Sequence, residues 1–211
     1  MGQHMDFSVH GFLDELASNS PAPGGGSVAA YSLCLGAALV EMVCALTIGR
    51  KKYASVQDMM VAIQQEAHAL RAEADALVQS DADAYNAVMA AFGLPKESDE
   101  DKATRKQAIL AATQVACSVP RTTALLSIKL YDMALQALEL GNPNAASDAF
   151  VATHLAHTGG MAALANVRIN LSGLSDADQV AALSQEIEAI EADLQVRYEK
   201  AMLLSKVRIG G

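Results

Sequence analysis

The sequence contains little of what a β-sheet protein needs. It has no tryptophan and only 4% aromatic residues, although 52% of its residues are hydrophobic. Alanine, leucine, valine and methionine supply most of this apolar content, which suits closely packed helices better than a β-sandwich. A convincing alternation of polar and apolar residues is also missing, so we expect no strand. The composition therefore predicts an all-α fold.

Cysteine and positive charge are scarce as well. The three cysteines, Cys34, Cys44 and Cys117, form no CxxC pair and lie in apolar helical patterns. This favours reduced, buried thiols and a cytoplasmic protein. The 15 basic residues are outnumbered by 24 acidic ones, which leaves a net charge of -9. Because phosphate neutralisation requires a basic face, the balance argues against a nucleic-acid partner, although a local basic cluster could still hold a small anion.

Linkers, internal repeats and low-complexity stretches are also missing. The 211 residues therefore predict one helical bundle over residues 6–211. We expect residues 1–5 to be a cloning remnant that precedes a native start at Met5, and no signal peptide is visible. Pro120 indicates either a kink or a new first turn. Periodicity, caps and breakers place the expected helices at residues 8–17, 27–47, 55–92, 98–118, 120–141, 144–171 and 175–206.

The segment 28–48 is almost wholly apolar and about long enough to cross a membrane. It contains Glu41, however, and many small residues that let helix backbones approach closely. We therefore predict a long central helix that is buried in the protein, with no membrane partner. In a dimer this helix would pack at or near the interface.

The segment 20–27 combines two prolines, three consecutive glycines and a serine before this helix. One interpretation is a tight loop whose Ser27 caps the helix. The other is a binding turn, because glycines expose backbone N–H groups at a helix N-terminus, where polar or anionic ligand atoms are favoured. Gly24, Gly25, Gly26 and Ser27 are therefore candidate ligand contacts.

Charged residues form two further candidate groups. Asp81, Asp83 and Tyr85 lie between alanines in a helical stretch, where partial burial would raise a carboxyl pKa and create a general acid or base. The run of Arg50, Lys51 and Lys52 is either a solvated helix end or a site for carboxylates or phosphates.

Polar residues gather at the start of the helix expected over 144–171. They are Asn142, Asn144, Ser147 and Asp148, and turn or capping chemistry could account for most of them.

Further along the same helix, Asn166 and Asn170 share a face, while Arg168 points elsewhere. The two amides either bond neighbouring helices or contact the edge of a heterocycle.

No motif indicates a metal or a nucleotide. His154 and His157 are three residues apart, but no carboxylate stands where it would complete a metal site on that helix. The sequence also lacks a P-loop, a dinucleotide fingerprint and a Ser-His-Asp order.

Taken together, these motifs resemble the formiminotransferase-cyclodeaminase family, which includes cyclodeaminase domains and free-standing bacterial methenyltetrahydrofolate cyclohydrolases. The resemblance is carried in order by residues 12–17, 20–27, 46–53, 81–85, 94–96, 119–120, 141–148 and 166–171. Two departures are the segment 154–160, where relatives are richer in alanine, and Arg121, where an apolar residue is commoner.

The resemblance implies an all-helical homodimer that acts on a one-carbon tetrahydrofolate without a metal or redox cofactor. The substrate could carry one glutamate or a polyglutamate tail. The first reading is cyclodeamination, in which N10 attacks the formimidoyl carbon on N5 and expels ammonia. The alternatives are hydrolysis of the methenyl bridge to 10-formyltetrahydrofolate, or a non-catalytic relative that binds a folate or a protein.

For this chemistry we expect Asp83 or Asp148 to be the acid or base, helped by Lys52 or Lys51. The glycine turn would give backbone donors to the folate. The substrate contacts expected besides that turn are Arg50, Lys51, Asn142, Asn144, Ser147, Asn166, Arg168 and Asn170.

Overall fold

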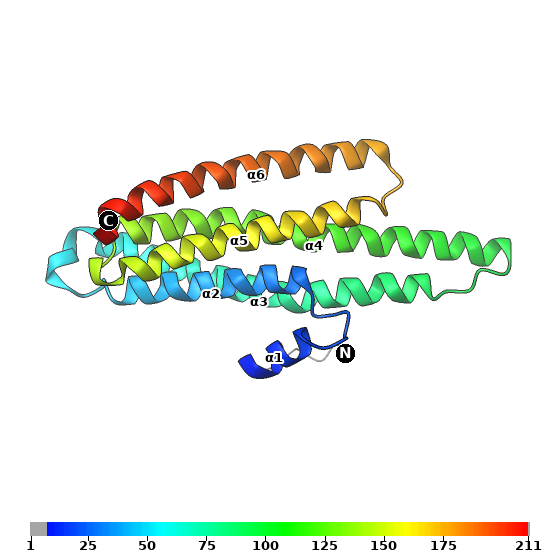
Figure 1. The fold of residues 1–211 in the computed structure, drawn as a ribbon, viewed down its shortest axis with the longest axis horizontal. Helices are drawn as coiled ribbons and strands as arrows, with labels where there is room; N and C mark the ends of the chain where they lie inside the picture. Colours follow the sequence, from blue (N-terminus) through cyan, green and yellow to red (C-terminus); the bar gives the residue numbers. More distant parts are fainter. Residues whose placement is uncertain (1–7, 211) are drawn as a thin grey trace.

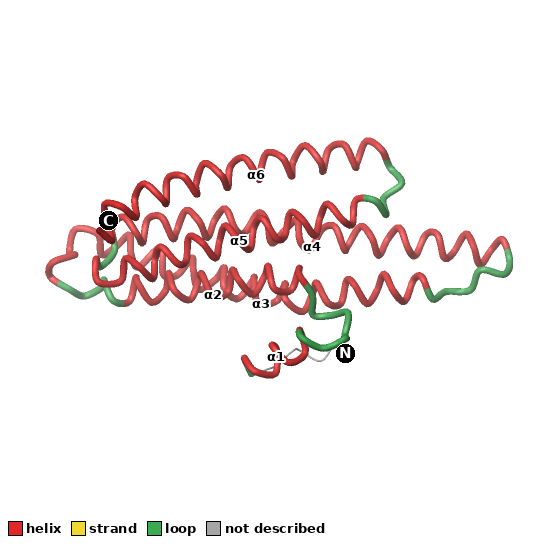
Figure 2. Tube along the Cα trace, in the orientation of Figure 1, coloured by secondary structure: helices red, strands yellow, loops and turns green. Residues whose placement is uncertain are grey.

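The computed structural model describes residues 8–210, and within them it contains helices and loops but no strand (Figure 2). The predicted all-α fold is confirmed. The prediction for residues 1–5 lies outside the described part. In chain order the elements are α1 (Val9–Leu16), α2 (Gly25–Ala45), the 3-10 helix η1 (Lys51–Val56), α3 (Gln57–Phe92), α4 (Asp99–Leu140), the 3-10 turn η2 (Pro143–Ala145), α5 (Ala146–Leu171), α6 (Ala177–Ser205) and the π-helical turn η3 (Lys206–Gly210).

Four helices, α2 to α5, form the bundle (Figure 1). The core helix α2 packs against α3, α5 and α4, while α6 lies on α4 and α5 at the outer face. The helices α3 and α4 are longer than their neighbours and extend together beyond the others. The short α1 stands apart from the bundle and meets it where the Phe12 ring lies 5.1 Å from the Tyr31 ring.

Helix α2 is buried along three sides, as its composition predicts. Leu33, Val40 and Val43 are fully buried on it. Among the described residues it is the one helix long and apolar enough to span a membrane by length and composition, with a mean hydropathy of 1.9 and half of that stretch buried. A core helix of a bundle meets the same criteria. The apolar residues on its fourth side are not covered by any residue that the structure describes.

Glycines on α5 bring it close to its neighbours. A Cβ on Gly159 would lie 2.9 Å from the Ala29 carbonyl oxygen on α2, and one on Gly160 would lie 2.3 Å from the Ser127 hydroxyl on α4. Real Cβ atoms do not approach so closely, so the absence of a side chain permits this packing. The 154–160 departure noted in the sequence therefore lies at helix contacts.

Two expected helix boundaries are wrong. Helix α2 begins at Gly25, with Gly24 as N-cap and no side-chain cap, so Ser27 does not cap it. Helix α4 runs through Pro120 without ending. Proline lacks the N–H that would bond the carbonyl of Ala116 four residues earlier. That carbonyl instead accepts a 2.7 Å hydrogen bond from the Asn170 side chain on α5, which removes the penalty for an orphaned acceptor.

Candidate functional site

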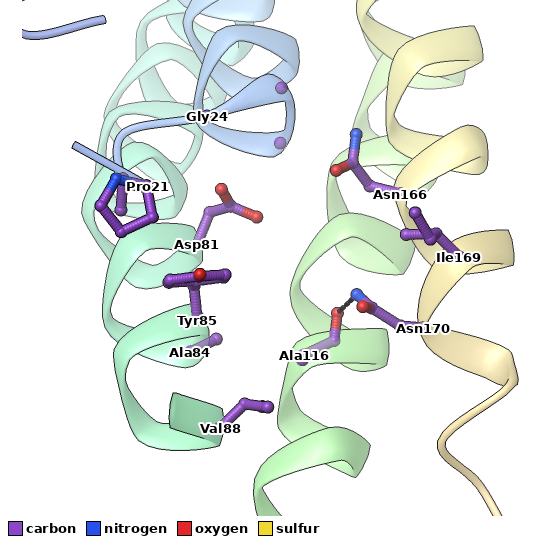
Figure 3. A pocket seen from close by; sticks show the side chains of 13 residues that line it. Pro21, Gly24, Asp81, Ala84, Tyr85, Val88, Ala116, Asn166, Ile169 and Asn170 are labelled. Atoms are coloured by element: carbon purple, nitrogen blue, oxygen red, sulfur yellow. Dashed lines mark hydrogen bonds between the residues drawn. The ribbon is translucent and has the colours of Figure 1, made fainter. Parts of the chain in front are cut away.

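A cavity of about 310 Å³ opens at the start of α2, between α3, α4 and α5 (Figure 3). Its volume lies at the lower end of the range for small-molecule sites. The glycine turn forms one wall, and the Asp81-containing segment of α3 faces α5 across the opening. The lining residues are Pro21, Ala22, Gly24, Gly25, Gly26, Asp81, Ala84, Tyr85, Val88, Ala116, Asn166, Ile169 and Asn170.

Asp81 lies directly beside the glycine turn. The Ser27 hydroxyl is 3.0 Å from Asp81 Oδ2 and equally 3.0 Å from the Val78 carbonyl oxygen, so it can donate its one proton to either. A Cβ on Gly26 would lie 2.1 Å from Asp81 Oδ1. The third glycine therefore leaves the space that the carboxyl group occupies.

Burial raises the pKa of the Asp81 carboxyl group above its ordinary value, although hydrogen bonds from Ser27 oppose the shift. The Ser27 arrangement suits both charge states. When Asp81 is ionised, the hydroxyl donates to it. When Asp81 is protonated, the carboxyl can donate to Ser27 Oγ while the hydroxyl turns to the Val78 carbonyl. Such a group can accept and return a proton without leaving a buried donor or acceptor unpaired.

The wall opposite Asp81 carries two carboxamides. Asn166 Nδ2 donates to the Ala162 carbonyl at 2.9 Å, and Asn170 Nδ2 donates to Ala116. These bonds orient the amides, so their oxygens are the atoms that can accept from a ligand. Tyr85 lies beside Asp81 in Figure 3 and is 38% exposed, which leaves its ring available to stack on a heterocycle.

Most of the other predicted site residues lie at the far end of α2. The basic run Arg50–Lys52 follows the helix C-terminus, and the segment 142–148 lies at the same end of the bundle (Figure 1). Since α2 has 21 residues, a rise of 1.5 Å per residue separates this end from the glycine turn by about 30 Å. Within one chain, the predicted residues therefore form two groups rather than one.

At that far end Asn142 connects three segments of the chain through hydrogen bonds. Its side chain accepts from the Tyr53 hydroxyl at 3.2 Å and donates to the Leu46 carbonyl at 3.2 Å. Its backbone N–H donates to the Thr47 hydroxyl. These bonds join the end of α2, η1 and the α4–α5 turn. Nearby Asn144 and Ser147 are exposed, and Asp148 is half-buried.

Two predicted residues near the cavity point away from it. Asp83 is exposed and accepts a 2.9 Å hydrogen bond from Gln79 on its own helix. Arg168 forms an ion pair with Glu191 on α6. The structure thus groups Gly24–Gly26, Ser27, Asn166 and Asn170 around a different carboxylate, Asp81.

The sequence contained a signal for Asp81 and Tyr85, because residues four apart share a helix face. It contained none for Ala116 or Ile169, which line the cavity only through the packing of α4 and α5. No cluster of three potential metal ligands occurs in residues 8–210. His154 and His157 instead pack around the Tyr198 ring.

The formiminotransferase-cyclodeaminase family model matches residues 8–189 of this chain. The chain belongs to that family. The recognition made from the motifs is therefore confirmed, and so is the prediction that the protein is an enzyme.

Individual relatives differ in length and in name. A methenyltetrahydrofolate cyclohydrolase from Methylorubrum extorquens is 40% identical over 193 residues, which is 92% of this chain and 93% of that protein. The mouse formimidoyltransferase-cyclodeaminase is 36% identical over 82% of this chain, but the match spans only 32% of the mouse protein. The crystal structure of a formiminotetrahydrofolate cyclodeaminase from Thermotoga maritima superposes with a TM-score of 0.84 at 29% identity, covering 94% of this chain and 96% of that one.

Proposed function

We propose that this enzyme hydrolyses 5,10-methenyltetrahydrofolate to 10-formyltetrahydrofolate, with Asp81 as the general acid and base. The main observation behind the proposal is the partly buried Asp81 carboxyl group, which lies between Ser27 and the glycine turn. The side-chain amides of Asn166 and Asn170 line the same cavity. The full-length similarity to a methenyltetrahydrofolate cyclohydrolase supports this reaction over the cyclodeamination that was our first reading of the sequence.

In the proposed mechanism, Asp81 accepts a proton from water as the water oxygen attacks the bridge carbon. The resulting tetrahedral carbon carries a hydroxyl group between N5 and N10. The bond from this carbon to N5 then breaks, Asp81 returns its proton to N5, and the hydroxyl proton leaves to solvent as the formyl group forms. One water is consumed and one proton is released. The raised pKa of Asp81 suits it to both transfers, because it makes the carboxylate a stronger base and leaves more of the group protonated, and so able to donate, near neutral pH.

The surrounding groups would hold the folate in place. Backbone N–H groups at Gly25 and Gly26 start α2 without a side-chain cap, so they are free to donate to polar folate atoms. The Tyr85 ring would stack on the pterin, and the oxygens of Asn166 and Asn170 would accept from its N–H groups. Fixing the bridge carbon near Asp81 would lower the barrier further, because the reacting groups are already oriented.

Cyclodeamination is the second candidate, favoured by the structural match to the Thermotoga cyclodeaminase. It needs the same proton transfers, because attack of N10 on the formimidoyl carbon also gives a tetrahedral carbon between two nitrogens. In that reaction Asp81 would protonate the departing ammonia. Since both reactions need only proton transfer and orientation, we propose that neither metal nor redox cofactor takes part. We also propose that the enzyme works in the cytoplasm, because its cysteines Cys34, Cys44 and Cys117 are free and buried.

Absorbance of the methenyl bridge tests the proposal directly. With purified protein, accelerated loss of 5,10-methenyltetrahydrofolate indicates the cyclohydrolase. A rise in absorbance from 5-formimidoyltetrahydrofolate indicates the cyclodeaminase. Absence of turnover on both substrates by a folded protein that still binds folate would replace the proposal with a non-catalytic binding role.

Substitution of individual aspartates tests which carboxylate is the general acid and base. We expect Asp81→Asn to lower kcat by about 10²- to 10⁴-fold, the usual contribution of a positioned acid or base. Asp83→Asn changes the same charge two residues away but outside the cavity, and Asp148→Asn changes it at the far end. A large loss with Asp83→Asn and near-normal turnover with Asp81→Asn would contradict the assignment.

A further inference from the structure

The cavity lacks a group that its proposed ligand requires. Among its described lining residues Asp81 is the only charged one, and it carries the wrong sign for the carboxylates of a folate glutamate tail. Carboxylates removed from water need cationic or strong hydrogen-bonding partners. Arg168, a candidate from the sequence, is paired with Glu191. The partners of the tail must therefore lie outside the cavity.

A second pocket, of about 240 Å³, contains positive charge. It lies between the start of α4 and the α5–α6 loop, at the end of the bundle where α3 and α4 extend beyond the other helices (Figure 1). Half of its described lining residues are cations and none is acidic, although acidic residues outnumber basic ones in the chain as a whole. We call it the basic pocket, and its cations are Lys96, Lys102, Arg105 and Lys106.

Three of these cations are not neutralised by the protein. Lys96, Arg105 and Lys106 form no ion pair with any described residue. Arg105 is half-buried, donates hydrogen bonds of 3.3 and 3.2 Å to the Phe92 carbonyl oxygen, and lies 5.6 Å from the centroid of the Phe92 ring. These contacts fix the guanidinium through Nε and Nη2, so its Nη1 group can donate to a carboxylate of a ligand.

The acidic residues near the basic pocket have other positions. Lys102 pairs with Asp99 at 2.9 Å, but the Asp99 side chain is 99% exposed, so this ion pair is weak and easily exchanged. Asp101 takes part in the cap of α4, and Glu97 accepts a hydrogen bond from the backbone N–H of Lys96. The basic pocket therefore offers its charge to a ligand.

The basic pocket adjoins the cavity along two helices. On α4, Ala116 lines the cavity, while Lys106 and Lys102 follow on the same face at helical spacing and line the basic pocket. On α5, Asn170 lines the cavity, and the N–H of Gly173 in the basic pocket donates to the Asn170 carbonyl oxygen at 3.0 Å. A rise of 1.5 Å per residue places Lys106 about 15 Å beyond Ala116 and Lys102 about 21 Å beyond it.

We infer that the basic pocket binds the carboxylates of a γ-linked polyglutamate tail, while the ring system of the folate occupies the cavity. The inference rests on the proposed function, since that function brings a folate to the cavity. Each added glutamate contributes one free carboxylate. A γ-linked unit is longer than an α-peptide unit of about 3.8 Å, so a few units span the distance to Lys106. Four cations in one pocket suit several carboxylates better than the single glutamate of an unextended folate.

Binding of folates that differ only in tail length tests the inference. The probes are 5-formyltetrahydrofolate with one glutamate and the same compound with three. We expect the triglutamate to bind about 5- to 50-fold more tightly at low salt, because its additional carboxylates form charge-assisted hydrogen bonds. The advantage should shrink as the ionic strength rises. Equal affinities for the two probes would overturn the inference.

Two double variants assign the effect to the basic pocket. Lys102→Ala with Lys106→Ala should remove most of the triglutamate advantage and change the monoglutamate affinity by less than about twofold. In turnover, the same variant should raise KM for a triglutamate substrate and leave kcat unchanged, because neither lysine lines the cavity. The control, Lys200→Ala with Lys206→Ala, removes the same charge from exposed positions at the other end of the bundle and should bind both probes normally. Equal losses for both tail lengths, or the same loss in the control, would overturn the inference.

Equilibrium binding separates this inference from the proposed function, because it needs no turnover. Asp81→Asn should lose activity but keep the preference for the longer tail. An active enzyme that ignores tail length would overturn the inference alone, whereas an inactive protein that prefers the triglutamate would overturn the proposed function alone. Inorganic phosphate is the competing ligand. Phosphate that weakens binding of the monoglutamate and the triglutamate equally would assign the basic pocket to a free anion and overturn the inference.

Discussion

At the scale of single residues, the site depends on a missing side chain. Gly26 has no Cβ, and the Asp81 carboxyl group fills the space that a Cβ would need. The carboxyl group is therefore held against the start of α2, where Ser27 can donate to it. The glycine that permits this close packing also lines the cavity.

This competition for space predicts the effect of adding a methyl group. Gly26→Ala should displace Asp81 and lower kcat by at least about 100-fold, approaching the loss from removal of a general base. Gly24→Ala should cost much less, because its Cβ would meet nothing nearer than the Pro21 carbonyl oxygen at 3.7 Å. Steady-state kinetics of the two variants test this. Equal losses would show that the turn matters for its backbone conformation rather than for the space beside Asp81.

The pH dependence of activity should report Asp81. A general base must be ionised, so kcat/KM should fall as the pH drops through the Asp81 pKa, at a pH above the ordinary range for aspartate because burial raises that pKa. Hydrogen bonds from Ser27 lower the same pKa. Ser27→Ala should therefore move the acid limb of the profile to higher pH. A limb that stays in place, or moves to lower pH, would contradict the role of Ser27.

At the scale of secondary-structure elements, one side chain explains why α4 continues through a proline. Asn170 donates from α5 to the Ala116 carbonyl that Pro120 leaves without a partner. The bond ties α4 to α5 at the wall of the cavity, so the same residue supports the fold and lines the cavity.

A double-mutant cycle measures this support. Asn170→Ala should lower the free energy of unfolding by about 1–3 kcal/mol, since it leaves a buried acceptor unpaired. In a Pro120→Ala background the backbone N–H is restored, and the cost of Asn170→Ala should shrink. Denaturant titrations of the four proteins give the coupling. Additive effects would mean that the two residues act independently.

The Arg121 departure noted in the sequence has a structural role in holding α6. Its guanidinium donates two hydrogen bonds, of 2.6 and 2.7 Å, to Glu186 and thereby lowers the pKa of that carboxyl group. A lowered folded-state pKa stabilises the protein above the unfolded pKa of Glu186, and the contribution is lost as the pH falls through the folded one. Both side chains are partly exposed, at 41% and 31%.

We therefore expect Arg121→Ala to cost no more than about 1 kcal/mol near neutral pH. The cost should vanish in acid, where Glu186 is protonated in both states. Thermal or denaturant unfolding at several pH values tests the trend. A difference from wild type that grows as the pH falls would have the wrong sign for this ion pair.

At the scale of the whole molecule, one apolar side of α2 lies exposed, where Leu35, Met42 and Leu46 are 44%, 39% and 38% exposed. We expect the homodimer that the family resemblance implies to form on this side, because exposed apolar patches mark binding surfaces. Leu35→Glu would bury a carboxylate in such a contact and should convert the protein to a folded monomer. Sedimentation measures the mass and circular dichroism the fold. A dimer that survives Leu35→Glu would place the interface elsewhere.

Local signals allowed most of the helices to be predicted, because capping and periodicity act over a few residues. The acidic cap at Ser98 is one example, where the serine and Asp101 side chains each bond the other's backbone. The choice between Asp81 and Asp83 could not be made, because the two side chains point about 200° apart around the helix and each aspartate is followed by an alanine, so the local sequence does not show which one faces the bundle. The separation of Lys52 from Gly26 could be predicted, because a straight helix over residues 27–47 keeps its two ends about 30 Å apart. Which helices pack beside each end appears only in the assembled bundle.

The contact between Gly26 and Asp81 also constrains how this gene can change. The two positions are distant in the sequence, but a side chain at position 26 would occupy the space of the carboxyl group at position 81. A descendant with a side chain at position 26 must therefore lose or displace that carboxyl group. With Asp81 in its proposed role, a glycine and an aspartate at these positions would accompany catalysis among descendants of this chain, and their joint replacement would mark descendants that have lost turnover.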